Sequence, residues 1–361
     1  MILFLSALGV QMLFMCAYTI AIGRYKPAKG DDQNPAPVSV VICAFNEIEN
    51  LKSLIPKLLN QSHPDYEIII VNDQSTDGTY EYLMKLKEEN DKVRMVQINE
   101  IPDHFSRKKY GITLGVKAAK NEVLVFTDAD CYPNSEEWLQ SMAMAHDENT
   151  QMAIGASLYE KRKGFLNHFI RYETYWTAIQ YLACALLRMP YMGVGRNMSY
   201  TKSLFLSNNG FKKHQQIVGG DDDLFINEHA NSGNTQVAIG NASLTYSYPK
   251  ISFKTFFRQK MRHLSVGKFY KFKHKIILGL YTLTYLVFWI TGVGLIFAYP
   301  ELIGISIVVR MGMIYLMYYI VSKKIGERYV PLILPLLDIV YGFYYIATAV
   351  ITVFSKRIRW S

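Results

Sequence analysis

Two aspartates that follow a run of four apolar residues are the part of this sequence best suited to chemistry. Residues 123–126 read Val-Leu-Val-Phe and lead through Thr127 to Asp128-Ala-Asp130. A strand that ends there delivers both carboxylates to the C-terminal edge of a sheet, where open α/β folds bind their ligands. Two such carboxylates favour a hard divalent cation or a polar ligand between them. An acidic turn is the alternative, and this pattern alone leaves both open.

Polar side chains also follow two earlier apolar runs that read as strands. Residues 38–42 lead to Asn46 and Glu47, and residues 66–71 lead to Asp73. The chain has neither a GxGxxG fingerprint nor a GxxxxGK[ST] phosphate loop. Three polar strand ends at one sheet edge predict a nucleoside held by carboxylates and a diphosphate held through a metal ion.

A second acidic cluster, Asp221-Asp222-Asp223, follows two glycines. Adjacent carboxylates repel one another, so at least one of them is expected to face solvent or a ligand. A carboxylate in a cleft near the membrane can act as a general base on a hydroxyl group. The alternative is a helix N-terminus enriched in acidic residues by the helix dipole.

A basic helix further along the chain places Gln259, Arg262 and His263 within one turn. An arginine and an amide on one helix face can grip a diphosphate leaving group. A basic helix that faces a membrane would explain most of the charge in this region, but it does not require Gln259.

Alternating strands and helices must position these groups. Strand patterns at residues 38–42, 66–71, 93–98 and 123–126 alternate with helical patterns. The first helix is predicted to be capped near Asn46, the second by Ser75 or Thr76, and a third to cover residues 107–120. This alternation predicts an α/β domain with a mostly parallel sheet and right-handed crossovers.

Apolar segments near both ends predict a membrane protein. Half of the 361 residues are hydrophobic. The runs at residues 1–22, 276–298 and 302–320 have about the ~20 residues that a spanning helix needs. Pro335 and Asp338 interrupt a further run, residues 332–354, which either spans the membrane or is re-entrant or interfacial, and we favour the second. The predicted parts are an anchor (1–23), a soluble domain (35–249), a basic amphipathic segment (250–275) and a C-terminal membrane region (276–354).

The net charge of +9 has a local origin, because residues 250–275 contain nine Lys or Arg and no Asp or Glu. Aromatic residues alternate with these cations directly before a predicted span, which is typical of an interfacial helix on anionic lipid and disfavours nucleic acid as a partner. Flanking cations place the soluble domain in the cytoplasm, although the run at 356–359 conflicts with this if the last segment spans. The flanking cations that place the domain in the cytoplasm are Arg24, Lys26, Lys29, Lys323, Lys324 and Arg328.

The four cysteines show no paired spacing and are predicted to be reduced thiols.

Together these motifs resemble the inverting family-2 glycosyltransferases, whose nucleotide-sugar-binding domain has the GT-A fold, over roughly residues 38–265. The resemblance implies Asp222 as the catalytic base with Asp221 beside it, and Asp130 as the ligand of Mg²⁺ or Mn²⁺. Residues 259–263 correspond to the family's Q/RxxRW motif, with His263 in place of its Trp. The nucleotide-sugar site that the resemblance implies comprises Ala44, Asn46, Glu47, Asp73, Lys108, Asp128, Gln259, Arg262 and His263.

The resemblance also implies an activity. A sugar would pass from a nucleotide diphosphate sugar, by family habit a UDP-sugar, to a lipid, lipid-linked or growing polysaccharide acceptor. The reaction would occur at the cytoplasmic face of the cell inner (plasma) membrane. A processive synthase of the cellulose or hyaluronan type is the alternative, but the missing Trp and the small membrane region favour single additions.

Two readings from other classes are a membrane nucleotidyltransferase and an inactive membrane scaffold. A nucleotidyltransferase would need a phosphate-gripping loop where Asn46 and Glu47 stand, and the retained acidic residues argue against a scaffold. The aromatic stretch at residues 165–187 would either admit an acceptor lipid at the membrane or pack in a core. Residues 193–197 resemble the acceptor-side loop of the family.

Overall fold

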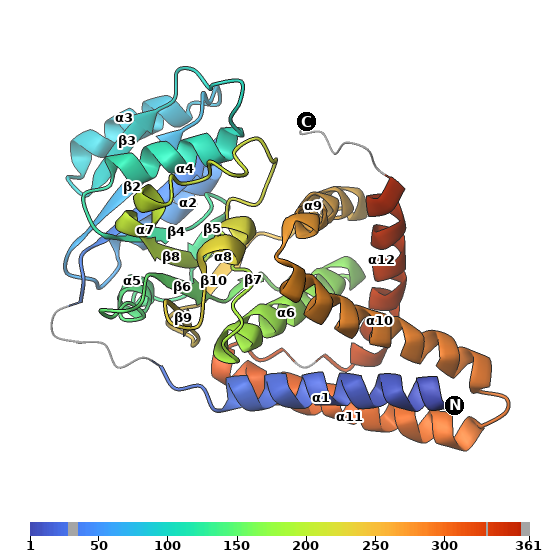
Figure 1. Ribbon diagram of the computed structural model, residues 1–361. Coiled ribbons are helices and arrows are strands. Elements are labelled where there is room, and N and C mark those ends of the chain that lie inside the picture. Colours follow the sequence, from blue (N-terminus) through green and yellow to red (C-terminus); the bar gives the residue numbers. More distant parts are fainter. Residues whose placement is uncertain (28–34, 330, 355–361) are drawn as a thin grey trace.

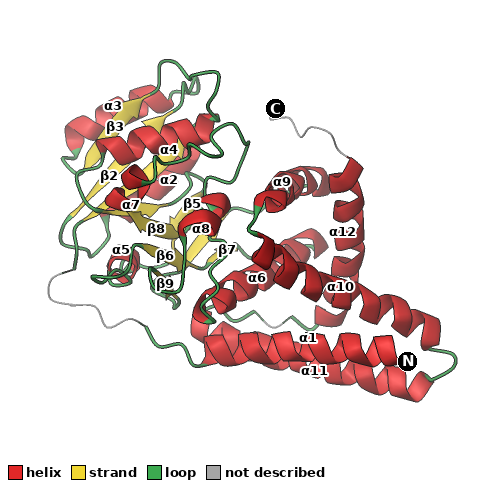
Figure 2. Ribbon diagram, viewed as in Figure 1, coloured by secondary structure: helices red, strands yellow, loops and turns green. Residues whose placement is uncertain are grey.

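A computed structural model describes residues 1–27, 35–329 and 331–354 of the chain; Lys29 and residues 356–359, which entered the prediction of orientation, lie outside them. Figure 1 shows an α/β domain beside a group of long helices, and Figure 2 shows that the strands are confined to the α/β domain. The strands are β1 Val38–Ala44, β2 Tyr66–Asn72, β3 Val93–Gln97, β4 Val123–Phe126, β5 Cys131–Pro133, β6 Met152–Gly155, β7 Ser157–Tyr159, β8 Met198–Thr201, β9 Thr235–Ala238 and β10 Thr245–Ser247. The helices are α1 Ile2–Gly23, α2 Ile48–Leu59, α3 Thr79–Glu89, α4 Arg107–Ala118, α5 Trp138–Ala143, α6 Phe165–Leu186, α7 Lys202–Ser207, α8 Asp223–His229, α9 Phe253–Val266, α10 Phe272–Leu295, α11 Pro300–Ile325 and α12 Leu334–Phe354, with a short 3₁₀ helix at Gly267–Phe269.

The main sheet has seven strands in the order β3-β2-β1-β4-β8-β6-β9. Strands β1 to β4 are parallel, with Ala44 opposite Asn72 and Val41 opposite Phe126. Strand β8 runs antiparallel to both of its neighbours, β4 and β6. The four predicted strands and the mostly parallel sheet are therefore confirmed, and the loops after β1, β2 and β4 share one edge.

Each face of this sheet is covered by its own helices. Apolar side chains of α2, α3 and α5 pack on one face, with Leu51, Leu83 and Trp138 among the buried residues. Helices α4, α7 and α8 pack on the other, through residues such as Ile112 and Phe225. The strands are buried on both faces, which explains their nearly continuous apolar sequences.

The helix caps differ from the prediction because both come from Asp77, which lies just before α3 and also reaches the start of α2 from a neighbouring loop. The backbone N–H of Ile48 donates to Asp77 Oδ2 (3.0 Å), and that of Thr79 donates to Asp77 Oδ1 (3.1 Å). Asn46, predicted to lie near the first cap, instead accepts a hydrogen bond from the N–H of Thr76 (2.8 Å). One aspartate thus caps α2 and α3 together, and the β1 and β2 loops are tied to each other.

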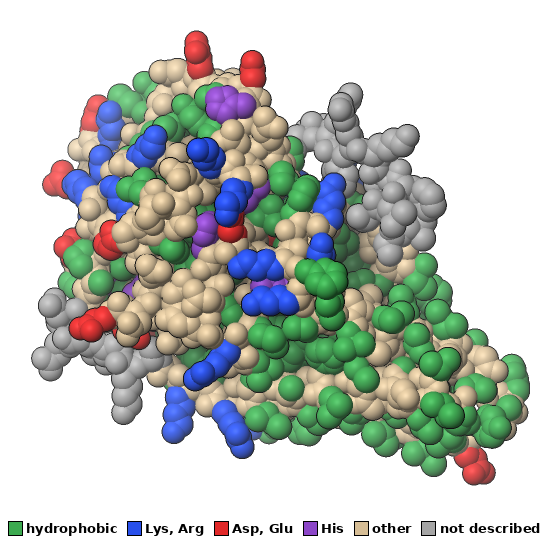
Figure 3. Space-filling model, in the orientation of Figure 1, with side chains coloured by type: hydrophobic (Ala, Val, Ile, Leu, Met, Phe, Trp, Pro, Cys, Tyr) green, Lys and Arg blue, Asp and Glu red, His purple; other side chains and the backbone are tan. Residues whose placement is uncertain are grey.

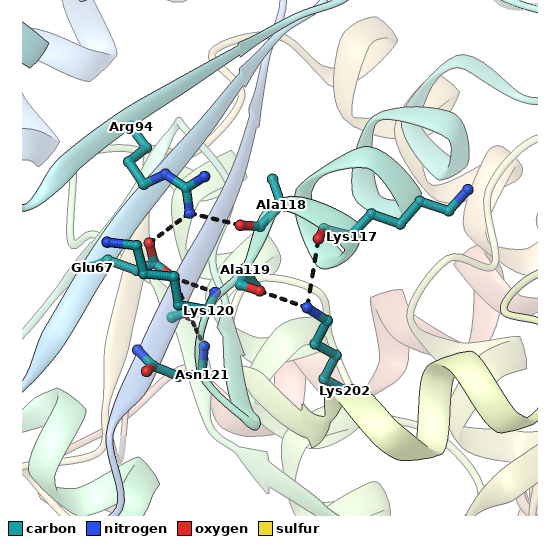
Figure 4. Close-up of polar contacts among 9 residues, drawn as sticks. Glu67, Arg94, Lys117, Ala118, Ala119, Lys120, Asn121 and Lys202 are labelled. Atoms are coloured by element: carbon teal, nitrogen blue, oxygen red, sulfur yellow. Dashed lines mark hydrogen bonds and ion pairs between the residues drawn. The ribbon is translucent and has the colours of Figure 1, made fainter.

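A buried carboxylate, Glu67 at the start of β2, fixes helix α4 at the sheet edge opposite these loops (Figure 4). Glu67 accepts hydrogen bonds from the N–H of Lys120 (2.6 Å), from Ser39 (2.7 Å) and from Arg94 (3.0 Å). Arg94 also donates to the carbonyl of Ala118, the last residue of α4 (2.6 Å). The far end of α4 is thereby anchored, and its first turn, with Arg107 and Lys108, lies at the loop edge.

The membrane region is built on the predicted apolar segments. Helices α1, α10 and α11 are each long and apolar enough to cross a membrane, and α12 has a shorter apolar stretch, Leu334–Thr348. Figure 1 shows α1 and α11 side by side with α12 lying crosswise to them, and hydrophobic side chains cover this region in Figure 3. The three predicted spans therefore exist as helices of sufficient length.

A buried ion pair joins two of the membrane helices. Arg310 of α11 and Asp338 of α12 are 0% and 2% exposed, and their side chains meet at 2.6 and 3.1 Å. Arg310 also donates to Gln11 of α1 (2.8 Å), and Tyr172 of α6 donates to Asp338 (3.1 Å). In the sequence, Asp338 argued against a lipid-facing helix at residues 332–354. In the structure, its charge is paired inside the protein.

The aromatic helix α6 packs in a core. The sequence left membrane contact and core packing open for its aromatic residues. Phe169, Tyr172, Tyr175, Trp176 and Tyr181 are buried, and Phe165 is exposed. Several of these rings stack on α10, α11 or α12, as between Tyr172 and Tyr318 (6.0 Å, 11°). Core packing is therefore the role of these aromatic residues.

The basic segment is also more complex than one amphipathic helix. Helix α9 carries residues 259–263, the 3₁₀ turn at Gly267–Phe269 follows, and α10 begins at Phe272. The predicted helical turn that holds Gln259, Arg262 and His263 is confirmed.

Candidate functional site

The turn between β4 and β5 carries the Asp128-Ala-Asp130 motif at the edge of the main sheet. Lys108 in the first turn of α4 contacts Asp128 Oδ1 at 2.9 Å and Asp221 Oδ2 at 3.0 Å. Burial alone would lower the pKa of Lys108, but the carboxylates of Asp128 and Asp221 raise it well above its ordinary value. This lysine therefore stays charged and joins the two acidic motifs that the sequence separates by about ninety residues.

Two glycines aim the second acidic cluster. Gly219 and Gly220 have φ angles of +82° and +72°, a region that side chains other than glycine rarely adopt. Asp222 follows as the N-cap of α8, and its Oδ1 accepts a hydrogen bond from the N–H of Asp223 (2.8 Å). Its Oδ2 accepts one from the N–H of Gly195 (2.8 Å). The carboxylate of Asp222 is thus held by backbone groups on two sides, and each oxygen keeps a second lone pair.

The three adjacent aspartates differ in charge state. Burial would raise the pKa of Asp221, but the Lys108 ammonium lowers it below the ordinary value. Burial, followed by the charge of Asp221, raises the pKa of Asp222. Burial and the charge of Asp222 raise that of Asp223, whose Oδ2 accepts a hydrogen bond from Tyr270 (2.7 Å). An aspartate with a raised pKa is a stronger base than an ordinary one, which suits Asp222 for proton abstraction.

Asp73 directly follows β2 and is held by an arginine of α4. Arg107 forms a two-pronged contact with it, from Nε to Oδ2 (3.0 Å) and from NH2 to Oδ1 (3.1 Å), and the guanidinium lies 4.6 Å from the Phe45 ring. Burial raises the pKa of the Cys43 thiol to about 12, and the charges of Asp221, Asp128 and Asp73 contribute. Asp73 is therefore fixed at the loop edge of the sheet by an arginine from the first turn of α4.

The remaining residues predicted after β1 have mixed roles. The carbonyl of Ala44 accepts the N–H of Asp73 (2.8 Å), and Asn46 is engaged by Thr76, so both support the loops. Glu47 accepts a hydrogen bond from Asn50. Burial raises the pKa of Glu47, and the charge of Asp130 adds to this.

A cavity of about 560 Å³ lies between the α/β domain and helices α6 and α9. Figure 3 shows Lys and Arg side chains gathered at this junction. The predicted residues Ala44, Asn46, Glu47 and Asp73 lie outside the lining of the cavity. Eight of the predicted residues line it, namely Lys108, Asp128, Asp130, Asp221, Asp222, Gln259, Arg262 and His263.

Residues that the sequence did not single out also line the cavity. Arg196 lies 4.7 Å above the Tyr159 ring, and Tyr159 donates a hydrogen bond to Gln259 at 3.5 Å. Lys250 lines the cavity near Asp130, and Glu173 lines it from α6. Glu173 had a detectable signal, since it is the only acidic residue of α6, a helix rich in apolar and aromatic residues. The only sequence signal for Arg196 was its position in the 193–197 loop.

The Asp128–Asp130 turn fits a divalent cation. Carboxylate oxygens of Asp128 and Asp130 and the Cys131 sulfur lie within 4.8 Å of one another. Burial, followed by the charge of Asp128, raises the pKa of Asp130, so a cation there would relieve an existing repulsion. Hard carboxylate oxygens are the ligands that Mg²⁺ and Mn²⁺ prefer.

A mostly parallel sheet with one reversed strand and acidic loops at a single edge is the architecture of the GT-A class. The mannosyltransferase PcManGT from Pyrobaculum calidifontis, solved in complex with GDP-Man and Mn²⁺, matches this chain with a TM-score of 0.66 over 98% of both chains. The two share 17% sequence identity, so the likeness is one of fold.

Two family profiles match the sequence. The profile of glycosyl transferase family 2 matches residues 39–202, and that of glycosyl transferase family group 2 matches residues 123–353, well over half of the chain. The chain belongs to this family of glycosyltransferases.

Curated relatives agree with the family. The probable glycosyltransferase YdaM of Bacillus subtilis is 24% identical over 263 residues, which cover 67% of this chain and 60% of that protein. The cholesterol galactosyltransferase of Borreliella burgdorferi is 27% identical over 188 residues, which cover 50% of this chain and 45% of that protein. The chain thus spans less than two thirds of the length of these relatives.

Proposed function

We propose that this protein is an inverting glycosyltransferase that moves a sugar from a nucleotide diphosphate sugar to a hydroxyl of a membrane-associated acceptor. One observation carries this proposal. Asp222, the Lys108-bridged carboxylates and the Arg262 helix line a single cavity. A base, a cation-binding turn and a basic helix are the three parts that displacement of a nucleoside diphosphate needs.

In the proposed reaction, the acceptor oxygen attacks the anomeric carbon from the face opposite the diphosphate. The new carbon–oxygen bond forms as the bond to the diphosphate oxygen breaks, so the anomeric centre inverts. Asp222 accepts the acceptor's proton, and the nucleoside diphosphate leaves with the electron pair of the broken bond. The backbone N–H groups of Gly195 and Asp223 hold the Asp222 carboxylate in place for this step.

We assign the donor to the acidic and basic residues at the loop edge. Asp73, held by Arg107, would contact the base of the nucleotide, with Ala44, Asn46 and Glu47 shaping that end of the site. Gln259, Arg262 and His263 would contact the diphosphate from α9. Lys108 and Asp128 would line the same end of the cavity. A bound Mg²⁺ or Mn²⁺, held by Asp130, would neutralise the charge of the leaving diphosphate.

For the donor nucleotide we propose uridine, and the GDP-Man in the mannosyltransferase of similar fold makes GDP-sugars the second choice to test. The acceptor is proposed to be a lipid or a lipid-linked saccharide. The cholesterol acceptor in one relative's name supports this. So does the place of the cavity, between the α/β domain and helices that join the membrane region.

We propose that the protein lies in the cell inner (plasma) membrane with its α/β domain in the cytoplasm. Cations at the domain-proximal ends of the spans support this orientation, including Arg24, Lys26 and Lys323. The crosswise helix α12 would lie in the membrane interface rather than span the bilayer (Figure 1). Lipids of the membrane are therefore proposed partners, and nucleic acid is not.

The test is a screen of the full-length protein, purified in a detergent without sugar, against UDP- and GDP-sugars with Mg²⁺ or Mn²⁺. We expect nucleoside diphosphate release with at least one donor and loss of release on chelation of the metal. Binding and cleavage of a nucleoside triphosphate, with no binding of any nucleotide sugar, would contradict the proposal.

A further inference from the structure

Helix α6 has two faces that serve different environments. One face carries rings that pack against the membrane helices, such as Tyr175 on Tyr318 (5.2 Å) and Trp176 on Tyr281 (5.2 Å). The other face lines the catalytic cavity and is rich in hydroxyl groups and charge. Its cavity-lining residues are Glu173, Thr174, Thr177 and Tyr181.

A buried ion pair is the main feature of the cavity face. Glu173 is 6% exposed and pairs with Lys260 of α9, which is 9% exposed. Thr174 donates a hydrogen bond to Glu173 Oε2 (3.3 Å). Burying two charges incurs a desolvation penalty of several kcal/mol per ion, and apolar residues of similar size would often join two helices equally well. Glu173 and Lys260 also line the cavity, which places this pair within reach of a bound ligand.

The cavity face of α6 and the proposed base line the same cavity, which Tyr181, Thr177 and Asp222 all border. Tyr181 donates a hydrogen bond to the carbonyl of Gly155 (2.9 Å), which fixes its ring in the cavity wall. The Asp128–Asp130 turn takes the diphosphate end of the same cavity, which leaves the α6 wall for the group that attacks.

We propose that Glu173, Lys260 and Thr177 form the acceptor subsite, and that the acceptor group bound there is a saccharide. This rests on the proposed glycosyltransferase function and deepens it. Sugar hydroxyls both donate and accept hydrogen bonds, which matches a carboxylate acceptor, an ammonium donor and a threonine hydroxyl on one wall. A phosphate at this position would face the carboxylates of Glu173 and Asp222. An alkyl alcohol would leave most of these polar groups without partners.

The experiment compares three probes that share one alkyl chain: octyl glucoside, octyl phosphate and octanol. Binding of each probe to the full-length protein is measured by calorimetry with the nucleoside diphosphate and Mn²⁺ present, and acceptor KM is measured by nucleoside diphosphate release. Zwitterionic detergent is used because it contains no sugar. We expect octyl glucoside to bind about tenfold or more tightly than the other two, as expected from one or two additional hydrogen bonds to charged groups.

The variants Glu173→Gln and Lys260→Met should each raise the Kd and KM for octyl glucoside about tenfold. Their KM for the nucleotide sugar should stay unchanged. Thr177→Val, which leaves the ion pair intact, should have a smaller effect in the same direction. The matched control is Glu327→Gln. It breaks the ion pair between Glu327, which follows α11, and Arg171 of α6, and neither residue lines the cavity.

Three outcomes would overturn the acceptor subsite. The first is binding of octyl phosphate or octanol as tight as that of octyl glucoside. The second is binding of octyl glucoside by Glu173→Gln with the affinity of the unmodified protein. The third is a loss of binding in Glu327→Gln as large as in Glu173→Gln. Nucleotide-sugar binding is measured separately. Its absence in the unmodified protein would refute the proposed function, whereas normal donor binding with a failed saccharide preference would refute the subsite alone.

Discussion

Two buried charge networks in this protein differ in how their polar atoms are used. In the membrane region, Arg310 directs Nε to Gln11 and both terminal nitrogens to Asp338. Tyr172 donates to the Asp338 carboxylate, and Tyr285 donates to its backbone carbonyl. This network is closed, since its charged groups are matched by groups of the protein itself.

The network in the cavity is open. Lys108 joins Asp128 and Asp221, yet among the described residues the buried Asp223 Oδ1 and Arg196 NH1 have no hydrogen-bond partner. Buried polar atoms that lack partners carry a penalty unless a ligand or water meets them. The comparison teaches that burial of charge alone does not mark a functional site, and that incomplete pairing beside a cavity is the more useful sign.

The largest effect is expected where the open network meets the reaction. Asp222→Asn should lower kcat about 10²- to 10⁴-fold, because the amide cannot accept the acceptor's proton. Donor binding should change little. Thermal stability should fall modestly, because the amide oxygen can accept only one of the two backbone N–H groups that the carboxylate accepts. The measurement is nucleoside diphosphate release under saturating substrates. Unchanged turnover in this variant would show that another residue is the base.

Substitutions in the closed network of Arg310 and Asp338 should change the stability of the protein rather than its catalytic rate. Arg310→Met leaves Asp338 buried without its cation and should lower the free energy of unfolding by about 3–5 kcal/mol. The double variant Arg310→Met/Asp338→Leu should recover most of this loss, because no unpaired charge remains. Thermal unfolding in detergent measures both. A double variant as unstable as the single one would mean that the pair itself, rather than the unpaired charge, matters.

Arg107, which lies outside the cavity lining, should affect donor binding rather than the chemical step. Arg107→Met removes the two-pronged contact that orients Asp73, and should raise the KM for the nucleotide sugar about tenfold with kcat nearly unchanged. Steady-state kinetics with varied donor provide the measurement. Arg94→Met, at the opposite sheet edge, is the matched control and should leave this KM unaltered. A fall in kcat without a change in KM would place Asp73 in the chemistry rather than in donor binding.

The smallest expected effect is a shift in pH dependence. The raised pKa of Asp222 means that the base is protonated, and therefore inactive, up to a pH above the usual aspartate value of about 3.9. The ratio kcat/KM should thus fall as the pH drops through this raised pKa. Asp221→Asn removes the neighbouring charge that helps to raise it and should move the fall to lower pH. A shift in the opposite direction would contradict the coupling of these two carboxylates.

The fold could be predicted closely because its signals are local. Apolar runs bounded by polar turns predicted β1 to β4, and uninterrupted apolar runs predicted α1, α10 and α11. The helix caps could not be predicted, since Asp77 caps two helices from a loop between them. Ser75 and Thr76 are equally good capping residues by type, and only the approach of the two loops selects Asp77.

The candidate site could be predicted in part. Residues in recognisable motifs, such as Asp130, Asp222 and Arg262, line one cavity. Glu173 and Arg196 were missed as site residues because neither belongs to a spacing pattern that implies chemistry. Glu173 and Arg196 belong to the site because of the way α6 and the 193–197 loop face the cavity, which only the folded structure shows.

The sequence by itself determined the α/β class, the apolar helices and the acidic residues at the strand ends, because the periodicity of apolar residues and the turns between them are local features of the chain. Only the tertiary structure decided which charges are paired. Lys108 meets Asp221, Arg310 meets Asp338 and Glu173 meets Lys260 across large separations in the chain. The physical reason is that a charge pair forms wherever packing brings its members within a few ångströms and excludes water, which residue type and spacing do not encode.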